Sequence, residues 1–235
     1  DGLITLKTRR QSLDYDRSED AYLIRDRVKT MVGGEFGYQI GAATSAVIDI
    51  TQTYVRYDEQ LDFVTRDSDE TRVLVGVVWE STAATTGFAK VGYKEKEFED
   101  QSRGTFYGTD WEVGIDWQPV SYSTFRISTS ADTFETNGEG DFIRGQNYSV
   151  RWNHDWLERL STSFSVTQQD DEYVFNEIDI DNRDDELMNY SASLSYQARR
   201  WLKFSTYYQY TDRDSNRETI GYDKSVIGVT AEVTL

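Results

Sequence analysis

Residues 188–199 read MNYSASLSYQAR, and an apolar or aromatic side chain occupies every second position. The positions between them carry small polar, amide or cationic side chains. Alternation with a period of two places the two rows on opposite faces of a β-strand. Residues 202–210, LKFSTYYQY, and 227–235, IGVTAEVTL, alternate in the same way. The end of the chain therefore predicts a series of strands.

The side chains of the polar row distinguish a soluble sandwich from a membrane barrel. In a soluble sandwich this row faces bulk water and carries long Lys and Glu side chains. Here it is rich in Ser, Thr, Gly and Gln with scattered charge, as expected of a crowded lumen. The apolar row ends in Tyr and Trp, which is typical of a lipid face with interfacial girdles. A soluble sandwich and an open sheet are the alternatives, and an open sheet would leave exposed edges that closure removes.

The composition excludes several classes of protein. The chain has 235 residues, no Cys, one Pro and a net charge of −17. Absent cysteine excludes disulfides and thiolate metal sites, and the negative charge argues against a nucleic-acid partner. An aromatic content of 14% argues against disorder. No segment reaches the roughly 20 apolar residues of a membrane helix, and the absence of a signal peptide suggests a mature form.

About twelve segments have roughly the 9–11 residues that a tilted membrane strand needs. They lie at 2–10, 25–39, 45–56, 71–80, 86–96, 107–118, 124–134, 146–156, 160–168, 188–199, 202–210 and 227–235. Short and long connections alternate between them, and the long ones, such as 168–187, hold most of the acids. The sequence thus predicts one domain over residues 1–235. The expected fold is all-β: a transmembrane, antiparallel, up-and-down barrel with short periplasmic turns and long acidic outer loops.

Aromatic side chains gather near both ends of the expected strands. One predicted girdle lies beside the short turns and contains Trp79, Trp117, Trp156 and Trp201. The other lies near the long loops and contains Tyr54, Tyr93, Tyr190 and Tyr210.

The alternation also predicts which charged side chains point inward. The expected pore-lining set is Arg27, Lys29, Glu35, Asp49, Arg72, Glu80, Lys90, Lys94, Glu112, Asp116, Arg126, Asp132, Arg151, Arg199, Lys203 and Glu232. One interpretation is a set of mutually neutralising pairs that fills the barrel. The other is a mixed-charge constriction that selects anionic or polyhydroxyl solutes. Twelve strands lie between small filled barrels and 16–18-stranded porins, so any pore should be narrow.

An acidic run and the single histidine are two further candidate sites. The densest acidic run lies within residues 170–186, and Asp179 and Asp181 are candidate Ca²⁺ ligands, although they lack the Gly and terminal Glu of an EF-hand loop. The alternative is a solvated rim beside lipopolysaccharide, bridged loosely by divalent ions. His154, the single His, would need an adjacent nucleophile or activated water to serve a hydrolase. Its place near a short turn favours an interface residue, and we expect neither an enzyme nor a cofactor.

Several short segments carry a family resemblance. They are 200–204 (RWLKF), 208–210 (YQY), 212–216 (DRDSN), 222–225 (YDKS) and the turns at 117–119 and 155–157. With these segments the chain resembles the β-barrel porin family found in exopolysaccharide gene clusters of Gram-negative bacteria. The resemblance covers the C-terminal half well and the N-terminal half weakly. Members of that family are usually longer, with extra N-terminal strands, and outer-membrane chains commonly end in an aromatic residue rather than Leu235.

The resemblance implies an outer-membrane channel for saccharide passage that takes part in export of a capsule or biofilm polysaccharide. The implied partners are outer-membrane lipid, lipopolysaccharide, a saccharide polymer or oligomer and other polysaccharide-secretion proteins, but no nucleic acid. The chain is expected to be a shortened or processed form of a longer member. Two alternatives stay open: a barrel without an open pore that binds polymer or cations, and an outer-membrane hydrolase.

Overall fold

A computed structural model describes residues 1–14, 25–58, 65–82, 84–136, 139–175 and 182–234 of the chain. These residues form twelve strands and one short 3₁₀ helix, η1 (Gln101–Arg103). The strands are β1 (Gly2–Leu13), β2 (Arg27–Gln39), β3 (Thr44–Tyr57), β4 (Ser68–Thr82), β5 (Thr85–Phe98), β6 (Thr105–Val120), β7 (Ser123–Phe134), β8 (Phe142–Leu157), β9 (Leu160–Val174), β10 (Arg183–Arg199), β11 (Leu202–Ser215) and β12 (Tyr222–Val233). Within the described ranges, no helix has the length and apolar character needed to cross a membrane.

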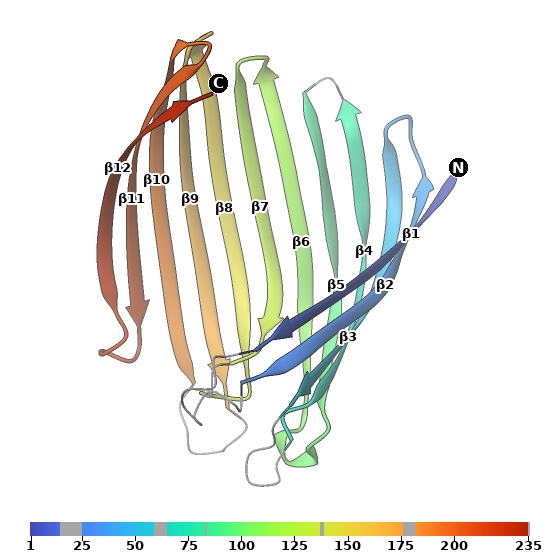
Figure 1. Cartoon of the computed structure of the whole chain (residues 1–235). Helices are drawn as coiled ribbons and strands as arrows, with labels where there is room; N and C mark the ends of the chain where they lie inside the picture. Colours follow the sequence, from blue (N-terminus) through green and yellow to red (C-terminus); the bar gives the residue numbers. More distant parts are fainter. Residues whose placement is uncertain (15–24, 59–64, 83, 137–138, 176–181, 235) are drawn as a thin grey trace.

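The strands form one antiparallel sheet in strict chain order, from β1 to β12. Figure 1 shows this sheet as a curved wall, with the short turns and both chain ends at one rim and the longer connections at the other. Strands β1 and β12 are the two ends of the strand order. The prediction of an all-β, twelve-stranded, up-and-down fold is confirmed.

The register places the two rows of side chains on opposite faces of the wall. On the convex face, Ile48 lies opposite Val75, and their exposed fractions are 46% and 51%. On the concave face, Asp49 lies opposite Leu74, and their exposed fractions are 3% and 0%. The concave face therefore buries a charged group, Asp49, beside an apolar one, Leu74, while the convex face exposes apolar groups as a lipid-facing surface requires.

Two glycines allow the wall to curve tightly between β4 and β5. A Cβ atom at Gly76 would lie 2.0 Å from the carbonyl oxygen of Ala89, and one at Gly92 would lie 1.8 Å from that of Val73. Any side chain at these positions would collide with the backbone of the neighbouring strand, which only glycine can approach so closely. Both glycines belong to the concave row, where curvature brings the strands together.

The structure corrects the expected boundaries of the outer loops. The strands have 12 to 17 residues rather than about ten. Strands β9 and β10 take up much of the expected loop 168–187, and β11 and β12 extend into the connection expected between 210 and 227. The acids at 170–172 and 184–186 accordingly lie on strands. Asp171 and Asp185 are direct cross-strand partners, an unfavourable pairing of like charges. Strand pairing continues there because arginines described below neutralise the acids.

Candidate functional site

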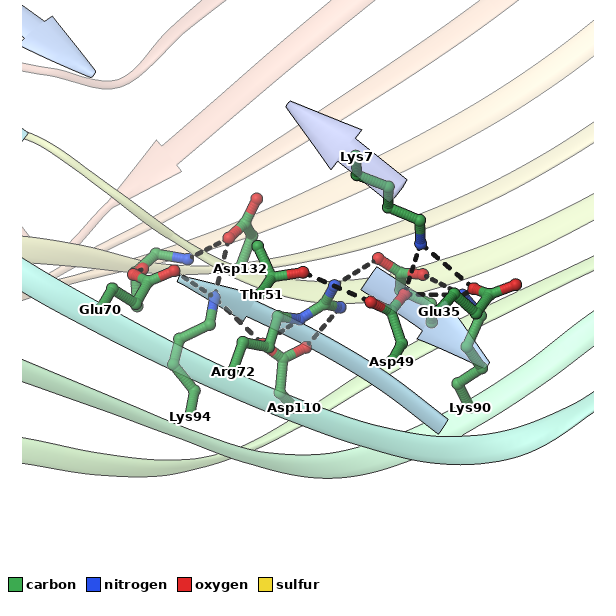
Figure 2. Close-up of polar contacts among 12 residues, drawn as sticks. Lys7, Glu35, Asp49, Thr51, Glu70, Arg72, Lys90, Lys94, Asp110 and Asp132 are labelled. Carbon is green, nitrogen blue, oxygen red and sulfur yellow. Dashed lines mark hydrogen bonds and ion pairs between the residues drawn. The ribbon is translucent and has the colours of Figure 1, made fainter. Parts of the chain in front are cut away.

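A network of ion pairs, which we call the ion-pair ladder, crosses the concave face of β1 to β7. Its members are Lys7, Glu35, Asp49, Arg72, Lys90, Lys94, Asp110, Glu112 and Asp132. Its first part links four strands: Lys90 Nζ lies 2.8 Å from Glu35 Oε2 and 3.1 Å from Asp49 Oδ2. Lys7 Nζ lies 2.7 Å from the same Asp49 oxygen. Figure 2 shows Lys7 and Lys90 converging on these carboxylates from opposite sides. The side chain of Lys90 passes over β4 because its partner on that strand is Gly76.

The ladder continues toward the long-loop rim. Arg72 Nε lies 3.0 Å from Asp110 Oδ2, and Arg72 Nη1 lies 2.7 Å from Glu112 Oε1. Lys94 Nζ lies 3.0 Å from Asp110 Oδ2 and 2.8 Å from Asp132 Oδ1. The Arg72 contacts join β4 to β6 across β5, and the contact between Lys94 and Asp132 joins β5 to β7 across β6. The contact between Lys94 and Asp110 joins the neighbouring strands β5 and β6. Buried ion pairs need such dense mutual contact, because each desolvated charge must be compensated.

The ladder leaves limited free space on this side of the interior. A cavity of about 500 Å³ remains between β1–β4 and β6–β7. Its lining includes Lys7, Arg9, Lys29, Arg72, Asp132 and Phe134. The ladder thus occupies part of this sector and borders the cavity, and both interpretations of the charged row stay predictions.

An outer-end core lies at the long-loop end of the same sector. It contains Phe98, Phe142, Lys96, Glu135 and Tyr57. Phe98 and Phe142 are buried with ring centroids 6.2 Å apart, and Lys96 Nζ lies 2.5 Å from Glu135 Oε1. The Tyr57 hydroxyl donates to Glu135 Oε2 at 3.2 Å. Burial and the adjacent Glu135 carboxylate both raise the pKa of Tyr57, so its hydroxyl keeps the proton that it donates.

The concave face of β8 to β12 has a different chemistry. Cross-strand pairing runs from Ser165 to Ser191 and then to Gln209, which fixes the inward row on each strand. We call this row the hydroxyl–amide wall; it contains Asn147, Ser149, Asn153, Ser161, Ser163, Ser165, Thr167, Asn189, Ser191, Ser193, Ser195, Ser205, Tyr207, Gln209 and Thr230. Arg151 lies within it and makes no ion pair to any residue that the structure describes. The same inward rows also hold Asp155 on β8 and the Lys203–Glu232 pair on β11 and β12, toward the short-turn rim.

Arginines neutralise the acids of the outer rim. Asp185 Oδ2 lies 2.5 Å from the Nη2 atoms of both Arg183 and Arg213. Burial opposes ionisation of Asp185, but hydrogen bonds from Arg183, Ser215 and Arg213 outweigh it and hold its pKa at about 2. Burial raises the pKa of Asp171, its cross-strand partner. Around Asp185 the described part of the rim is thus a charge cluster stabilised by arginine.

The pore-lining residues expected from the sequence fall into several groups. Seven of them join the ladder: Glu35, Asp49, Arg72, Lys90, Lys94, Glu112 and Asp132. Arg126 pairs with Asp116 at 2.6 Å, Lys203 approaches Glu232 at 3.9 Å, and Arg27 lies over the Tyr57 ring. In the described ranges, no ion pair involves Lys29, Glu80, Arg151 or Arg199. Whether these sixteen line an open pore stays a prediction.

Sequence reasoning missed several members of these clusters. Lys7 and Asp110 belong to the inward rows of β1 and β6, so the same alternation could have identified them. Lys96 and Glu135 could not be paired in this way. They lie 39 residues apart in the sequence, and no local pattern indicates that their strand ends meet.

The girdle at the short-turn rim contains more aromatic rings than the tryptophans predicted for it. Trp117 stacks on Phe125 with centroids 5.2 Å apart, and Phe125 stacks on Trp152 at 5.9 Å. His154 packs 4.3 Å from the Trp156 ring and 5.3 Å from that of Trp152. The convex face of β6 to β8 thus carries an aromatic band, in which His154 is one of the packed rings.

The other predicted girdle residues lie on the convex face, apart from Trp201, which lies in a turn. Trp79 is half-buried, Trp201 is exposed at the β10–β11 turn, and Tyr54 and Tyr93 are exposed near the long-loop rim. Tyr190 and Tyr210 are direct partners with ring centroids 6.3 Å apart. Their placement agrees with two levels of aromatic side chains, one toward each rim.

The candidate Ca²⁺ ligands Asp179 and Asp181 lie outside the described residues. A different carboxylate group, which the sequence did not single out, consists of Asp14, Asp26 and Asp58. Its ligand atoms lie within 4.8 Å of one another, a spacing that could hold a metal ion. Exposed acids commonly gather without an ion, so this geometry alone does not define a site.

A twelve-stranded antiparallel wall with an apolar convex face and a polar concave face defines a porin-like β-barrel protein. The chain matches the family described as "Putative beta-barrel porin 2" over residues 4–235, and it belongs to that family. The family points to a location in the outer membrane. No curated protein matches the chain.

Solved outer-membrane proteins show a weak similarity to the chain. A deltaS2 mutant of the TodX monoaromatic hydrocarbon channel has a TM-score of 0.40 and 10% identity, covering 100% of this chain and 79% of its own. OmpT of Vibrio cholerae with loop L8 deleted has a TM-score of 0.37 and 9% identity, covering 99% of each chain. In-vitro folded OmpT of the same organism has a TM-score of 0.34 and 8% identity, covering 99% of this chain and 95% of its own. Similarities at this level add nothing to the family assignment.

Proposed function

We propose that the protein forms a narrow, passive channel for saccharides in the outer membrane of a Gram-negative bacterium, as a component of polysaccharide export. The observation that carries this proposal is the hydroxyl–amide wall. Hydroxyl and amide groups both donate and accept hydrogen bonds, so they can replace the water around a sugar without attracting ions. A wall of this kind suits uncharged, polyhydroxylated solutes.

The proposed route follows β8 to β12 rather than the charged sector. The ladder occupies part of the concave face of β1 to β7, and the buried Lys96–Glu135 pair of the outer-end core lies at the long-loop end of that sector. Side chains such as Ser163 and Asn153, which are direct partners on β9 and β8, would then border the moving solute. Arg151, on the same wall, adds a positive charge along this route.

Planar-bilayer conductance and liposome swelling test the proposal. The purified protein should conduct and should admit maltotriose into liposomes. Replacing Ser163 and Asn153 together by Leu should slow swelling several-fold, because the wall loses hydrogen-bonding groups. Phe164→Leu, on the convex face of β9, is the matched control and should not change the rate. Absence of conductance in the unmodified protein would remove the channel.

A second candidate is a barrel without an open pore that binds polymer or cations at its outer rim. It is favoured by the outer-end core and by the arginine–carboxylate cluster around Asp185. In that case the protein would retain polymer at its surface but fail to conduct. Neutralising Arg183 and Arg213 should then release the polymer, while a true channel should keep its sugar flux.

A further inference from the structure

The ring of Tyr207 lies over Gly228 on the concave face of β11. Its direct partners are Ser193 on β10 and Gly228 on β12. A Cβ atom at Gly228 would lie 2.2 Å from Cε1 and 2.6 Å from the hydroxyl oxygen of Tyr207. The ring therefore covers the glycine, while 42% of the residue stays exposed. One ring face contacts the wall, and the other is available to the interior.

Stabilisation of the sheet explains the contact between Tyr207 and Gly228, but it does not explain why the rest of the ring is exposed. An aromatic ring that covers a cross-strand glycine compensates for the missing side chain, and Phe134 covers Gly145 in the same way. That contact uses one face of the ring. The exposed second face of Tyr207 is a planar apolar surface within a row of otherwise polar side chains.

Hydrogen-bonding groups surround this exposed ring face. Ser205 and Gln209 flank Tyr207 on β11, and Ser193 lies opposite it on β10. Ser205 is bonded to Ser195 at 2.9 Å. Across the part of the chain that the structure describes, the side chains of Ser193 and Gln209 make no hydrogen bond. A hydroxyl and an amide with unused bonding capacity thus border an aromatic platform.

We propose that Tyr207 is the platform of a saccharide-binding subsite on the hydroxyl–amide wall. A pyranose ring has an apolar C–H face, which the negatively charged face of an aromatic ring attracts. Its peripheral hydroxyls would bond to Ser193 Oγ and to the amide of Gln209, which offers two donors and an acceptor. The choice of a saccharide rests on the proposed function. The position of the subsite rests on Tyr207 and its neighbours.

Block of the ion current by maltohexaose tests this subsite. Tyr207→Leu keeps an apolar side chain but removes the flat ring, so the concentration for half-maximal block should rise about tenfold. Tyr207→Phe should stay within about twofold of the unmodified protein, since the platform remains. Tyr208→Leu is the matched control, because Tyr208 pairs with Ile227 on the convex face. It should leave the block unchanged.

A second variant covers the case in which Tyr207→Leu does not fold. Gln209→Ala leaves the ring on Gly228 and removes only hydrogen bonds, and it should weaken the block about fivefold. Unchanged block in a folded Tyr207→Leu or Gln209→Ala variant overturns the subsite and leaves the channel in place. If the unmodified protein does not conduct, calorimetric titration of the detergent-solubilised protein with maltohexaose decides. Binding that Tyr207→Leu abolishes supports the subsite without a channel, and no binding overturns both.

Discussion

Replacing Lys96 by Met tests whether the outer-end core is a closed, dehydrated cluster. Lys96 and Glu135 are 1% and 6% exposed, with Nζ and Oε1 2.5 Å apart. Removing the lysine leaves a buried carboxylate whose remaining hydrogen bond, among the described residues, comes from the Tyr57 hydroxyl. Loss of one partner from a buried ion pair typically costs about 3–5 kcal/mol. We expect the free energy of unfolding to fall by an amount in that range.

Two variants make the measurement specific. Arg126→Met breaks an ion pair of similar length, 2.6 Å, between side chains that are 56% and 43% exposed; an exposed pair is worth about 0–1 kcal/mol. Adding Glu135→Gln to Lys96→Met removes the uncompensated charge and should restore most of the lost stability. Tryptophan fluorescence during urea unfolding in lipid vesicles reports each value. Equal losses for Lys96→Met and Arg126→Met would mean that water reaches the outer-end core.

Three further substitutions or conditions probe other parts of the wall. Gly92→Val should prevent folding, because its Cβ would meet the Val73 carbonyl at 1.8 Å, and gel electrophoresis without heating should show no compact band. Leu194→Lys, on the convex face, should reduce stability in vesicles by about 2–4 kcal/mol, whereas Ser163→Lys on the concave face should fold normally. The pKa of Asp185 is lowered from about 3.9 unfolded to about 2 folded. The contribution of Asp185 to the free energy of unfolding is therefore complete above pH ~3.9 and disappears as the pH falls through ~2. Amide exchange at the outer rim should detect this loss.

The alternation of side chains predicted the faces of the sheet well. Ile48 and Asp49 fall on the faces that a period of two assigns, because each face has a uniform environment along its whole length. The same rule placed Lys90 and Glu112 in one inward row. It could not predict that Lys90 reaches a carboxylate on β2, since that contact depends on curvature, which glycine on the neighbouring strand allows.

Acidic composition misled the prediction of loop boundaries. Asp is unfavourable in strands, so the acids around Asp171 and Asp185 indicated a loop. Asp185 is compensated by Arg183 on the same strand and by Arg213, which lies 28 positions away in the sequence. Pairings of this kind leave no periodic signal. The position of Tyr207 in the inward row was readable from the sequence, but its contact with Gly228 required the register between β11 and β12.

The strict pairing of each strand with its sequence neighbours affects how the protein assembles. Hairpins can be added one after another, because every backbone ladder forms between segments that are adjacent in the chain. The contact between Glu35 and Lys90 is different, since it spans 55 residues. It can form only after β2 to β5 have been laid side by side and bent. This ion pair therefore forms late in biogenesis, after the first third of the wall has acquired its curvature.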